Sequence, residues 1–242
     1  MAGRLGRAIA AAVLGTTAVL GVATAASATT GVDRAAPATR APAVTVNYTA
    51  ILALSNCSGS LIRIAGASDD DPALALTNGH CSEFGMPGAG VVNVNQTSHR
   101  TFTLLNSSGK GSLGTLTANE ILYNTMTDTD VTLYRLTKSY RQIQQTYGTR
   151  ALTLAASHPT AGTSIDVVSG YWRQTYKCSI DAFAYQVREA DWTWRDSARY
   201  TSGCDVIGGT SGSPVINAAT DQVIAVNNTI NESGERCTLD NP

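Results

Sequence analysis

The stretch Gly208-Gly209-Thr210-Ser211-Gly212-Ser213-Pro214 places a serine among glycines, directly before the apolar, β-branched pair Val215 and Ile216. A serine hydroxyl is a weak nucleophile and becomes reactive only beside a general base that an acid orients. It also needs backbone N–H groups aimed at the developing oxyanion, and glycines let such groups converge without a Cβ in the way. The stretch therefore predicts a turn that presents Ser211, followed by a strand.

The N-terminal segment has the pattern of an export signal. Two arginines precede an apolar run of small residues at positions 8–25, and the cleavage-type motif Ala26-Ser27-Ala28 follows at once. The run is too weakly hydrophobic for a membrane anchor. We expect residues 1–28 to be removed as a signal peptide and residues 29–43 to form a pro-segment or linker. The mature protein is then extracellular and not bound to a membrane.

Composition narrows the class of protein further. Only 14% of the 242 residues are charged, which suits a secreted β-rich protein better than a cytosolic helical one. Without residues 1–43 the chain is mildly acidic and has no Lys/Arg run, so we expect no nucleic-acid partner. No two of the five cysteines have C-x-x-C spacing, so we expect no metal. Export favours disulfides, and the odd number leaves one cysteine over.

From residue 44 onward, short alternating segments are broken by Gly, Asn, Asp and Ser, which predicts β-strands. We expect them at 50–54, 60–64, 73–76, 91–94, 101–105, 130–136, 164–168, 182–194 (a hairpin or adjacent strands), 215–217 and 222–227. One helix is expected around Tyr140, Ile143 and Tyr147, with Thr137 or Ser139 as N-cap and Gly148 at its end. The prediction is an all-β fold with halves at 44–136 and 150–242, joined by a helical linker at 137–149.

Among the three histidines, His80 is the best candidate for a general base. It follows the buried-looking strand 73–76 and precedes Cys81, so a disulfide would pin its position. His99 and His158 stand in polar surroundings typical of a surface. For the acid there are two candidates, Asp128 and Asp130, whose spacing of two puts them on one face of a strand and leaves the choice open. We prefer Asp130 because the apolar alternation starts directly after it.

Chain order separates the known serine-based architectures. The α/β-hydrolase order of serine, acid and histidine is impossible because no histidine follows Ser211. A subtilisin-like order would need an acid in an α/β context before His80, and that region is β. The order that remains is His80, Asp130, Ser211.

Four motifs in this order resemble the trypsin/chymotrypsin-fold serine peptidases, and among them the secreted bacterial members near the glutamyl-endopeptidase branch. They are Leu76-Thr77-Asn78-Gly79-His80-Cys81, Asp130-Val131-Thr132-Leu133, the segment 159–171 and Gly209-Thr210-Ser211-Gly212-Ser213-Pro214. The resemblance covers about residues 44–237. It implies two packed antiparallel six-stranded β-barrels, with the catalytic triad in the cleft between them.

The same resemblance implies roles for individual residues. Ser211 would be the nucleophile, His80 the base and Asp130 the acid that orients it. The N–H groups of Gly209 and Ser211 would form the oxyanion hole. Cys57 and Cys81 would form the disulfide that braces the histidine loop. Such an enzyme acts on protein or peptide substrates, and we expect no cofactor and a monomer.

Departures from the family pattern also carry information. Thr210 stands where many members have the aspartate that pairs with a newly cleaved N-terminus, so we expect no activation of that kind. Asp205 matches the floor of the S1 pocket in trypsin-like members and implies a preference for Arg or Lys at P1. The alternative interpretation is that Asp205 lies in a surface loop. Asn227 stands where glutamyl-specific members have a histidine in the substrate site, which argues against Glu specificity.

Two further expectations concern the C-terminal part. Cys204 can pair with Cys237 or Cys178, and we favour Cys237. The chain ends soon after Ser211, so we expect C-terminal elements of the family to be missing. The alternative functions are an inactive peptidase-fold protein used for binding, which the intact His80, Asp130 and Ser211 disfavour, and a secreted lectin or adhesin domain, which has no need of this constellation.

Overall fold

The computed structural model describes residues 47–230. The expected signal peptide, the linker at 29–43 and Cys237 lie outside the described residues. The first group of elements comprises β1 (Ile51–Ala53), β2 (Ser58–Arg63), β3 (Pro72–Thr77), β4 (Val92–Thr97), β5 (Thr101–Leu105), β6 (Ser112–Thr125), β7 (Val131–Ser139), α1 (Tyr140–Tyr147) and β8 (Leu152–Thr153). The second comprises β9 (Ser164–Ser169), β10 (Gln174–Glu189), β11 (Trp192–Tyr200), β12 (Pro214–Asn217) and β13 (Val223–Val226).

The first sheet closes on itself. Its strands follow the order β1-β5-β6-β7-β3-β2, and the pairing of β1 with β2 completes a six-stranded barrel. Alternate side chains point inward and are almost fully buried, as expected for strands with one apolar face. This core includes Leu52, Leu61, Phe102, Leu104, Leu116, Ile121, Tyr134 and Leu136. β4 adds to the barrel through β6, and β8 runs parallel to β2.

Strand β6 is the main element that the sequence patterns did not predict. It pairs with β5, β4 and β7 and is central to the barrel. Its register with β7 shifts twice, between Ala118 and Glu120 and again between Ile121 and Tyr123. Each shift adds a residue on one strand and moves the inward-facing positions by one. The period-2 alternation is therefore interrupted, and the strand has no clean sequence signature.

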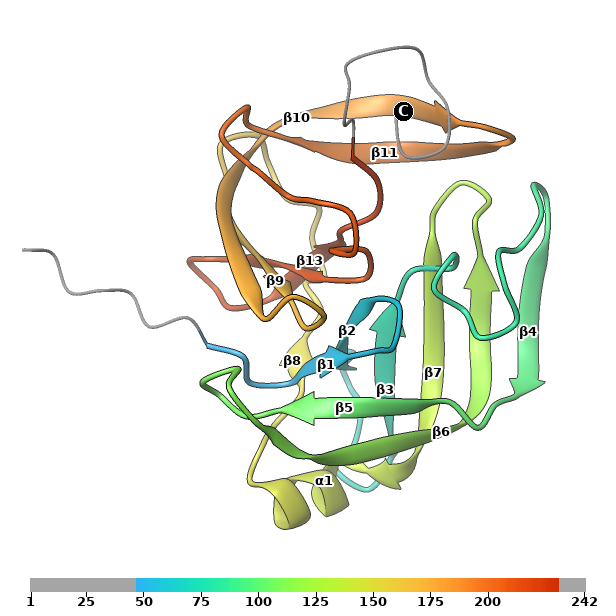
Figure 1. The fold of residues 1–242 in the computed structure, drawn as a ribbon, viewed down its shortest axis with the longest axis vertical. Helices are drawn as coiled ribbons and strands as arrows, with labels where there is room; N and C mark the ends of the chain where they lie inside the picture. The colour runs from blue at the N-terminus through green and yellow to red at the C-terminus, as the bar shows by residue number, and fades with distance from the viewer. Residues whose placement is uncertain (1–46, 231–242) are drawn as a thin grey trace, which may run out of the picture. The chain divides into compact units, whose positions relative to one another are not determined.

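The second sheet is open in the part of the chain that the structure describes. Five antiparallel strands follow the order β11-β10-β9-β12-β13 and form a half-barrel around Ile165, Val167, Tyr176, Ile180 and Val215. The all-β, chymotrypsin-like two-barrel class is confirmed, but six strands in the second barrel are not found among these residues. β10 and β11 form one hairpin much longer than the predicted 182–194 (Figure 1).

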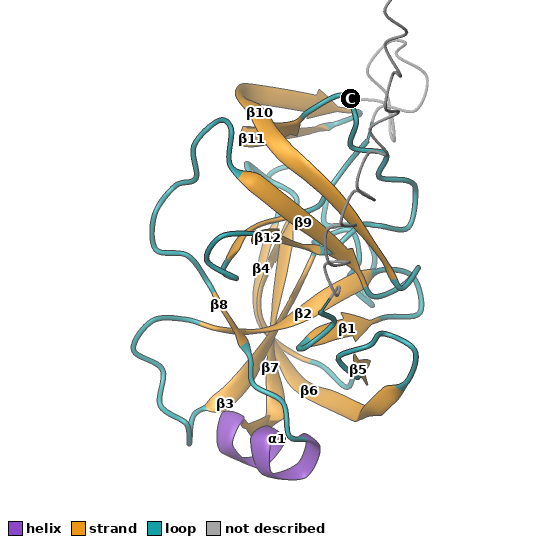
Figure 2. Cartoon of the chain, turned by 90° about the vertical axis from the view of Figure 1, so that its left-hand side faces the viewer, coloured by secondary structure: helices purple, strands orange, loops and turns teal. Residues whose placement is uncertain are grey.

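The single helix forms where the sequence predicts it. Ser139 caps its N-terminus: its side chain accepts a hydrogen bond from the Gln142 N–H, and the Ser139 N–H donates to the Oε1 atom of Gln142. Gly148 ends the helix in the left-handed conformation with φ 66°. α1 directly continues β7 (Figure 2). Within residues 47–230 no helix is long and apolar enough to cross a membrane.

Candidate active site

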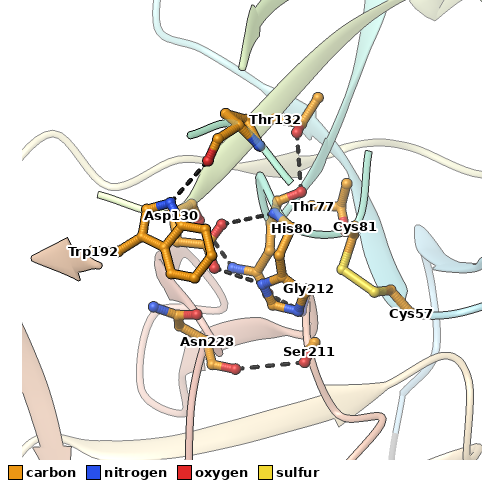
Figure 3. A network of polar contacts seen from close by, with 12 residues as sticks. Cys57, Thr77, His80, Cys81, Asp130, Thr132, Trp192, Ser211, Gly212 and Asn228 are labelled. Carbon is orange, nitrogen blue, oxygen red and sulfur yellow. Dashed lines mark hydrogen bonds and ion pairs between the residues drawn. A yellow bond between two sulfur atoms is a disulfide. The ribbon is translucent and has the colours of Figure 1, made fainter. Parts of the chain in front are cut away.

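His80 and Asp130 meet because two adjacent strands present them at the same end. β3 ends three residues before His80, β7 begins directly after Asp130, and the two strands pair with Thr77 opposite Thr132. The Nδ1 atom of His80 lies 2.6 Å from Oδ2 of Asp130, and the His80 N–H donates to Oδ1 at 3.0 Å. The Asp130 side chain is 1% exposed. One carboxylate therefore fixes both the ring and the backbone of the histidine (Figure 3).

The structure also separates the two aspartates that spacing left open. Asp128 forms an exposed ion pair with Arg195 of β11, with Nε and Oδ1 2.8 Å apart. Its backbone N–H donates to the Thr193 carbonyl, and its carbonyl accepts from the Arg195 N–H. Asp128 thus joins the β10–β11 hairpin to the first barrel, while Asp130 is the residue that contacts His80.

A disulfide and a buried polar network support the histidine loop. Cys57 and Cys81 are bonded, as the resemblance implied, and both are buried. The Arg100 guanidinium donates to the Cys81 carbonyl at 2.5 Å. Glu83 accepts from the hydroxyl of Tyr134, and burial together with this carboxylate raises the pKa of Tyr134 above its usual value. The two cysteine sulfurs lie within 4.8 Å of a His80 ring nitrogen, but a disulfide offers no thiolate ligand to a metal.

Backbone hydrogen bonds hold Ser211 against the first barrel. The Ser58 N–H donates to the Ser211 carbonyl at 2.8 Å, and the Gly212 N–H donates to Oδ1 of Asn78. Ser58 follows Cys57 and Asn78 precedes His80 by two residues, so the serine loop docks on the histidine loop. The Ser211 hydroxyl is directed at the Asn228 carbonyl, 3.5 Å away (Figure 3).

Asn78 is the site residue that sequence reasoning missed. It is fully buried, and its Nδ2 donates to the Asp130 carbonyl at 2.9 Å while its Oδ1 accepts from Gly212. One side chain therefore connects the loops of all three proposed catalytic residues. The sequence signal was an amide two residues after the buried strand 73–76, but Thr77-Asn78-Gly79 equally fits a turn.

Gly212 fits a position that no other residue can occupy without displacement. Its φ is +76°, and a Cβ there would lie 2.1 Å from the Ser58 carbonyl oxygen and 2.2 Å from Oγ1 of Thr77. Both contacts are far inside van der Waals distance. The absence of a side chain lets the serine loop approach strands β2 and β3 closely.

Two N–H groups in the serine loop are available for an oxyanion. Within the described residues, the N–H groups of Thr210, Gly212 and Ser213 donate to other protein atoms. The N–H groups of Gly209 and Ser211 make no such bond there. Gly209 has φ +85°, in a turn closed by the bond from Thr210 N–H to the Ile207 carbonyl at 3.1 Å.

Thr210 and Asn227 interact with each other inside the protein. Thr210 is 1% exposed, and its hydroxyl donates to the Ile207 carbonyl at 2.6 Å and accepts from the Asn227 amide at 3.0 Å. The other end of that amide accepts from the Tyr200 hydroxyl at 3.2 Å. Asn227, predicted to lie in the substrate site, is 1% exposed, and both polar atoms of its side chain are bonded within the protein, which does not favour a direct contact with substrate.

One expectation for this region is wrong. Cys204 pairs with Cys178 and not with the favoured Cys237, because β10 brings Cys178 beside the loop that follows β11. Asp205, the next residue, is exposed. A carboxylate at the floor of an S1 pocket would be buried, so Asp205 does not have the inward position that the trypsin-like alignment implied.

Chemically, this site combines an imidazole held by a buried carboxylate, a serine on a glycine turn beside that histidine's loop, and two unused N–H donors next to the serine. Such groups are suited to removing a proton from a hydroxyl and stabilising an oxyanion. The fold that holds these groups is the chymotrypsin-like two-barrel fold.

Comparison with known proteins places the chain in a family. The model of the trypsin-like peptidase domain matches residues 57–226, well over half of the chain. The chain therefore belongs to the trypsin-like peptidase domain family, and this supports peptidase activity on peptide substrates. No curated protein sequence matches at the significance required.

One solved protease structure shares the fold, and two others are similar at lower TM-scores. The MamO protease domain from Magnetospirillum magneticum is 11% identical, with 78% of this chain and 88% of that chain covered and a TM-score of 0.51. The inactive form of the Rv3671c protease of M. tuberculosis is 18% identical, with 78% and 81% covered and a TM-score of 0.49. A Glu endopeptidase is 15% identical, with 77% and 81% covered and a TM-score of 0.46.

Proposed function

We propose that this chain is a secreted serine endopeptidase that works through an acyl-enzyme. Ser211 attacks the peptide carbonyl, His80 takes the serine proton and then protonates the leaving amine, and Asp130 orients His80. The observation that carries the proposal is the 2.6 Å contact between His80 and the buried Asp130 carboxylate, next to the docked Ser211 loop. In the proposed mechanism the Gly209 and Ser211 N–H groups receive the oxyanion.

The decisive test is labelling of the purified protein with a fluorophosphonate, together with hydrolysis of a peptide library. We expect wild type to be labelled at Ser211 and to cleave peptides. Ser211→Ala is expected to abolish labelling and to lower kcat by about 10⁶-fold, as for catalytic serines in other proteases.

Ser213→Ala is the matched control. Ser213 is two residues away, fully buried, and its hydroxyl has no hydrogen-bond partner within residues 47–230. Its loss should leave labelling intact. If folded wild type is neither labelled nor active, the endopeptidase proposal fails, and the binding-protein alternative takes its place.

We further propose a modest preference for Arg or Lys at P1, carried by Asp205. The carboxylate is exposed, and an exposed charge attracts a cation only weakly in water. We therefore expect a few-fold advantage of Lys over Leu at P1, removed by Asp205→Asn and reduced at high salt. An unchanged ratio in Asp205→Asn would show that Asp205 plays no part in specificity.

The extracellular location is a proposal that the two disulfides support, because such bonds persist in oxidising compartments. We expect the protein in the culture medium, as a monomer, with its N-terminus created by cleavage after Ala28. N-terminal sequencing and size-exclusion chromatography of the secreted material test these points. A mature form that retains residues 1–28 would contradict them.

A further inference from the structure

The central peptide of a β-turn can take two orientations, and in the turn that precedes Ser211 only one of them would expose the proposed oxyanion donor. The turn spans Ile207 to Thr210, and its third residue, Gly209, has φ +85°. A positive φ at this place is the signature of a type II turn, whereas a type I turn has a negative φ there. The two types differ mainly by rotation of the central peptide, which joins Gly208 to Gly209.

Rotation of that peptide exchanges a donor for an acceptor. In a planar trans peptide the carbonyl of Gly208 and the N–H of Gly209 point in opposite directions. The peptide therefore directs either the N–H or the carbonyl oxygen to a given side. A contact that fixes the Gly208 carbonyl also fixes the direction of the Gly209 N–H.

Trp172 makes that contact. Its indole Nε1–H donates to the Gly208 carbonyl at 2.8 Å. A Cβ on Gly209 would lie 2.9 Å from the same Nε1 atom, so the indole packs directly on the glycine. The bond holds the carbonyl on the side of the indole and leaves the Gly209 N–H directed away from it, without a partner in the described chain.

The position of Trp172 is itself fixed by the first barrel. Its N–H donates to the Ser169 hydroxyl at 3.1 Å, and that hydroxyl lies 3.1 Å from the hydroxyl of Ser58. The intervening Gly170 lies against the Leu52 carbonyl so closely that a Cβ would lie 2.2 Å from the oxygen. Ser58, which binds the Ser211 carbonyl, therefore also supports the segment that carries Trp172.

We propose that Trp172 is a positioning residue that locks the Gly208–Gly209 peptide in the orientation in which the Gly209 N–H can serve the oxyanion. This inference rests on the proposed function. Trp172 is 47% exposed, so a substitution at this residue does not open the core. The sequence alone indicated only an aromatic near the start of the second sheet.

The test compares Trp172→Phe, which keeps an aromatic ring and removes the donor, with Trp172→His, which retains a ring N–H. We expect Trp172→Phe to lower kcat about tenfold with little change in KM, the size expected for loss of one hydrogen bond. Binding of a peptide aldehyde, which forms a tetrahedral adduct with the serine, should weaken by the same factor. Trp172→His should recover part of both.

Tyr171→Phe is the matched control, because Tyr171 is the neighbouring exposed aromatic and its ring contacts Trp172 edge-on at 4.9 Å. It should retain wild-type kcat. A crystal structure of Trp172→Phe is the readout that does not depend on activity, and we expect the Gly208 carbonyl to have rotated or to be split between two orientations.

The outcomes separate the two proposals. If Ser211→Ala is inactive but Trp172→Phe keeps the wild-type kcat and aldehyde affinity, the lock is overturned and the endopeptidase assignment stands. If wild type is not an enzyme, the endopeptidase assignment fails. The crystal structure of Trp172→Phe then still tests whether Trp172 fixes the orientation of the Gly208–Gly209 peptide. A Gly208–Gly209 peptide in the wild-type orientation in Trp172→Phe would overturn it.

Discussion

The loop that carries His80 and the loop that carries Ser211 are held in place by different means. The first is fixed within one closed barrel, by the end of β3, a buried disulfide and the Asp130 carboxylate. The second belongs to the open sheet, and its hydrogen bonds to Ser58 and Asn78 cross to the other half. The proposed base and acid thus depend on one barrel, whereas the proposed nucleophile depends on how the two sheets meet.

Breaking the contact between Gly212 and the first barrel should have the largest effect on activity. In Gly212→Ala the new Cβ would overlap the Ser58 carbonyl oxygen, 2.1 Å away, so Ser211 must move. A displacement of about 1 Å can cost 10²-fold in rate, and we expect at least that loss in kcat/KM.

Gly66→Ala separates this clash from backbone strain alone. Gly66 has a similar φ of +82°, but nothing lies within 4 Å of its added Cβ. It should cost about 1 kcal/mol of stability and leave kcat/KM unchanged. Equal losses of activity in the two variants would contradict the docking argument.

Removing the amide that joins the two loops should have the next largest effect. Asn78→Ala removes the amide that donates to the Asp130 carbonyl, and it removes one of the two acceptors of the Gly212 N–H, which also donates to the Asn227 carbonyl at 2.9 Å. A buried polar group left without its partner costs about 1–3 kcal/mol. We expect a loss of kcat of roughly 10- to 100-fold, since about 1.4 kcal/mol of lost transition-state stabilisation is tenfold.

Asn124→Ala is the control variant for Asn78→Ala. For both variants, stability is measured by urea unfolding and kcat by steady-state kinetics. Asn124 is equally buried and accepts from the Thr132 hydroxyl, but it does not contact the serine loop. It should destabilise the fold with little change in kcat. A similar kcat in the two variants would show that Asn78 acts only on stability.

The two disulfides, one in each half of the protein, allow the His80 loop and the second sheet to be compared through their covalent bonds. They close loops of nearly equal length, with sequence separations of 24 and 26, so the chain-entropy account predicts a similar loss of about 3 kcal/mol for each. Replacing Cys57 and Cys81 by Ala should also lower kcat several-fold, because their bond braces His80. Replacing Cys178 and Cys204 should lower mainly stability, and the reverse pattern of kinetics would refute this.

Adding residues in front of Val44 should have the smallest effect. Thr210 is bound by Asn227 and the Ile207 carbonyl, so its place does not depend on a new ammonium group. We expect equal kcat/KM for protein that starts at Val44 and for protein with a few extra residues before it. A large loss on extension would show that a free N-terminus is required.

The chemical groups and their order along the chain were predictable because local signals mark them. His80 follows a buried strand and precedes a cysteine, and Ser211 stands among glycines before an apolar pair. The alternation also predicted the β class and most strands. It did not predict β6, since two register shifts break the alternation.

Some residues could not be assigned from local signals. Asp128 and Asp130 have the same parity, and only the pairing of β3 with β7 shows which one contacts His80. The burial of Asn227 and the exposure of Asp205 depend on packing that no local pattern contains. The predicted pairing of Cys204 with Cys237 was wrong for the same reason.

The sequence by itself determined that this chain is an all-β protein with a histidine, an aspartate and a serine in the order of the trypsin-like peptidases. Only the tertiary structure decided which carboxylate contacts the histidine, that Asn78 joins the loops, and that Trp172 binds the turn before Ser211. The physical reason is distance along the chain. Asn78 and Gly212 are 134 residues apart, and such contacts depend on strand register and on glycine-sized gaps between sheets.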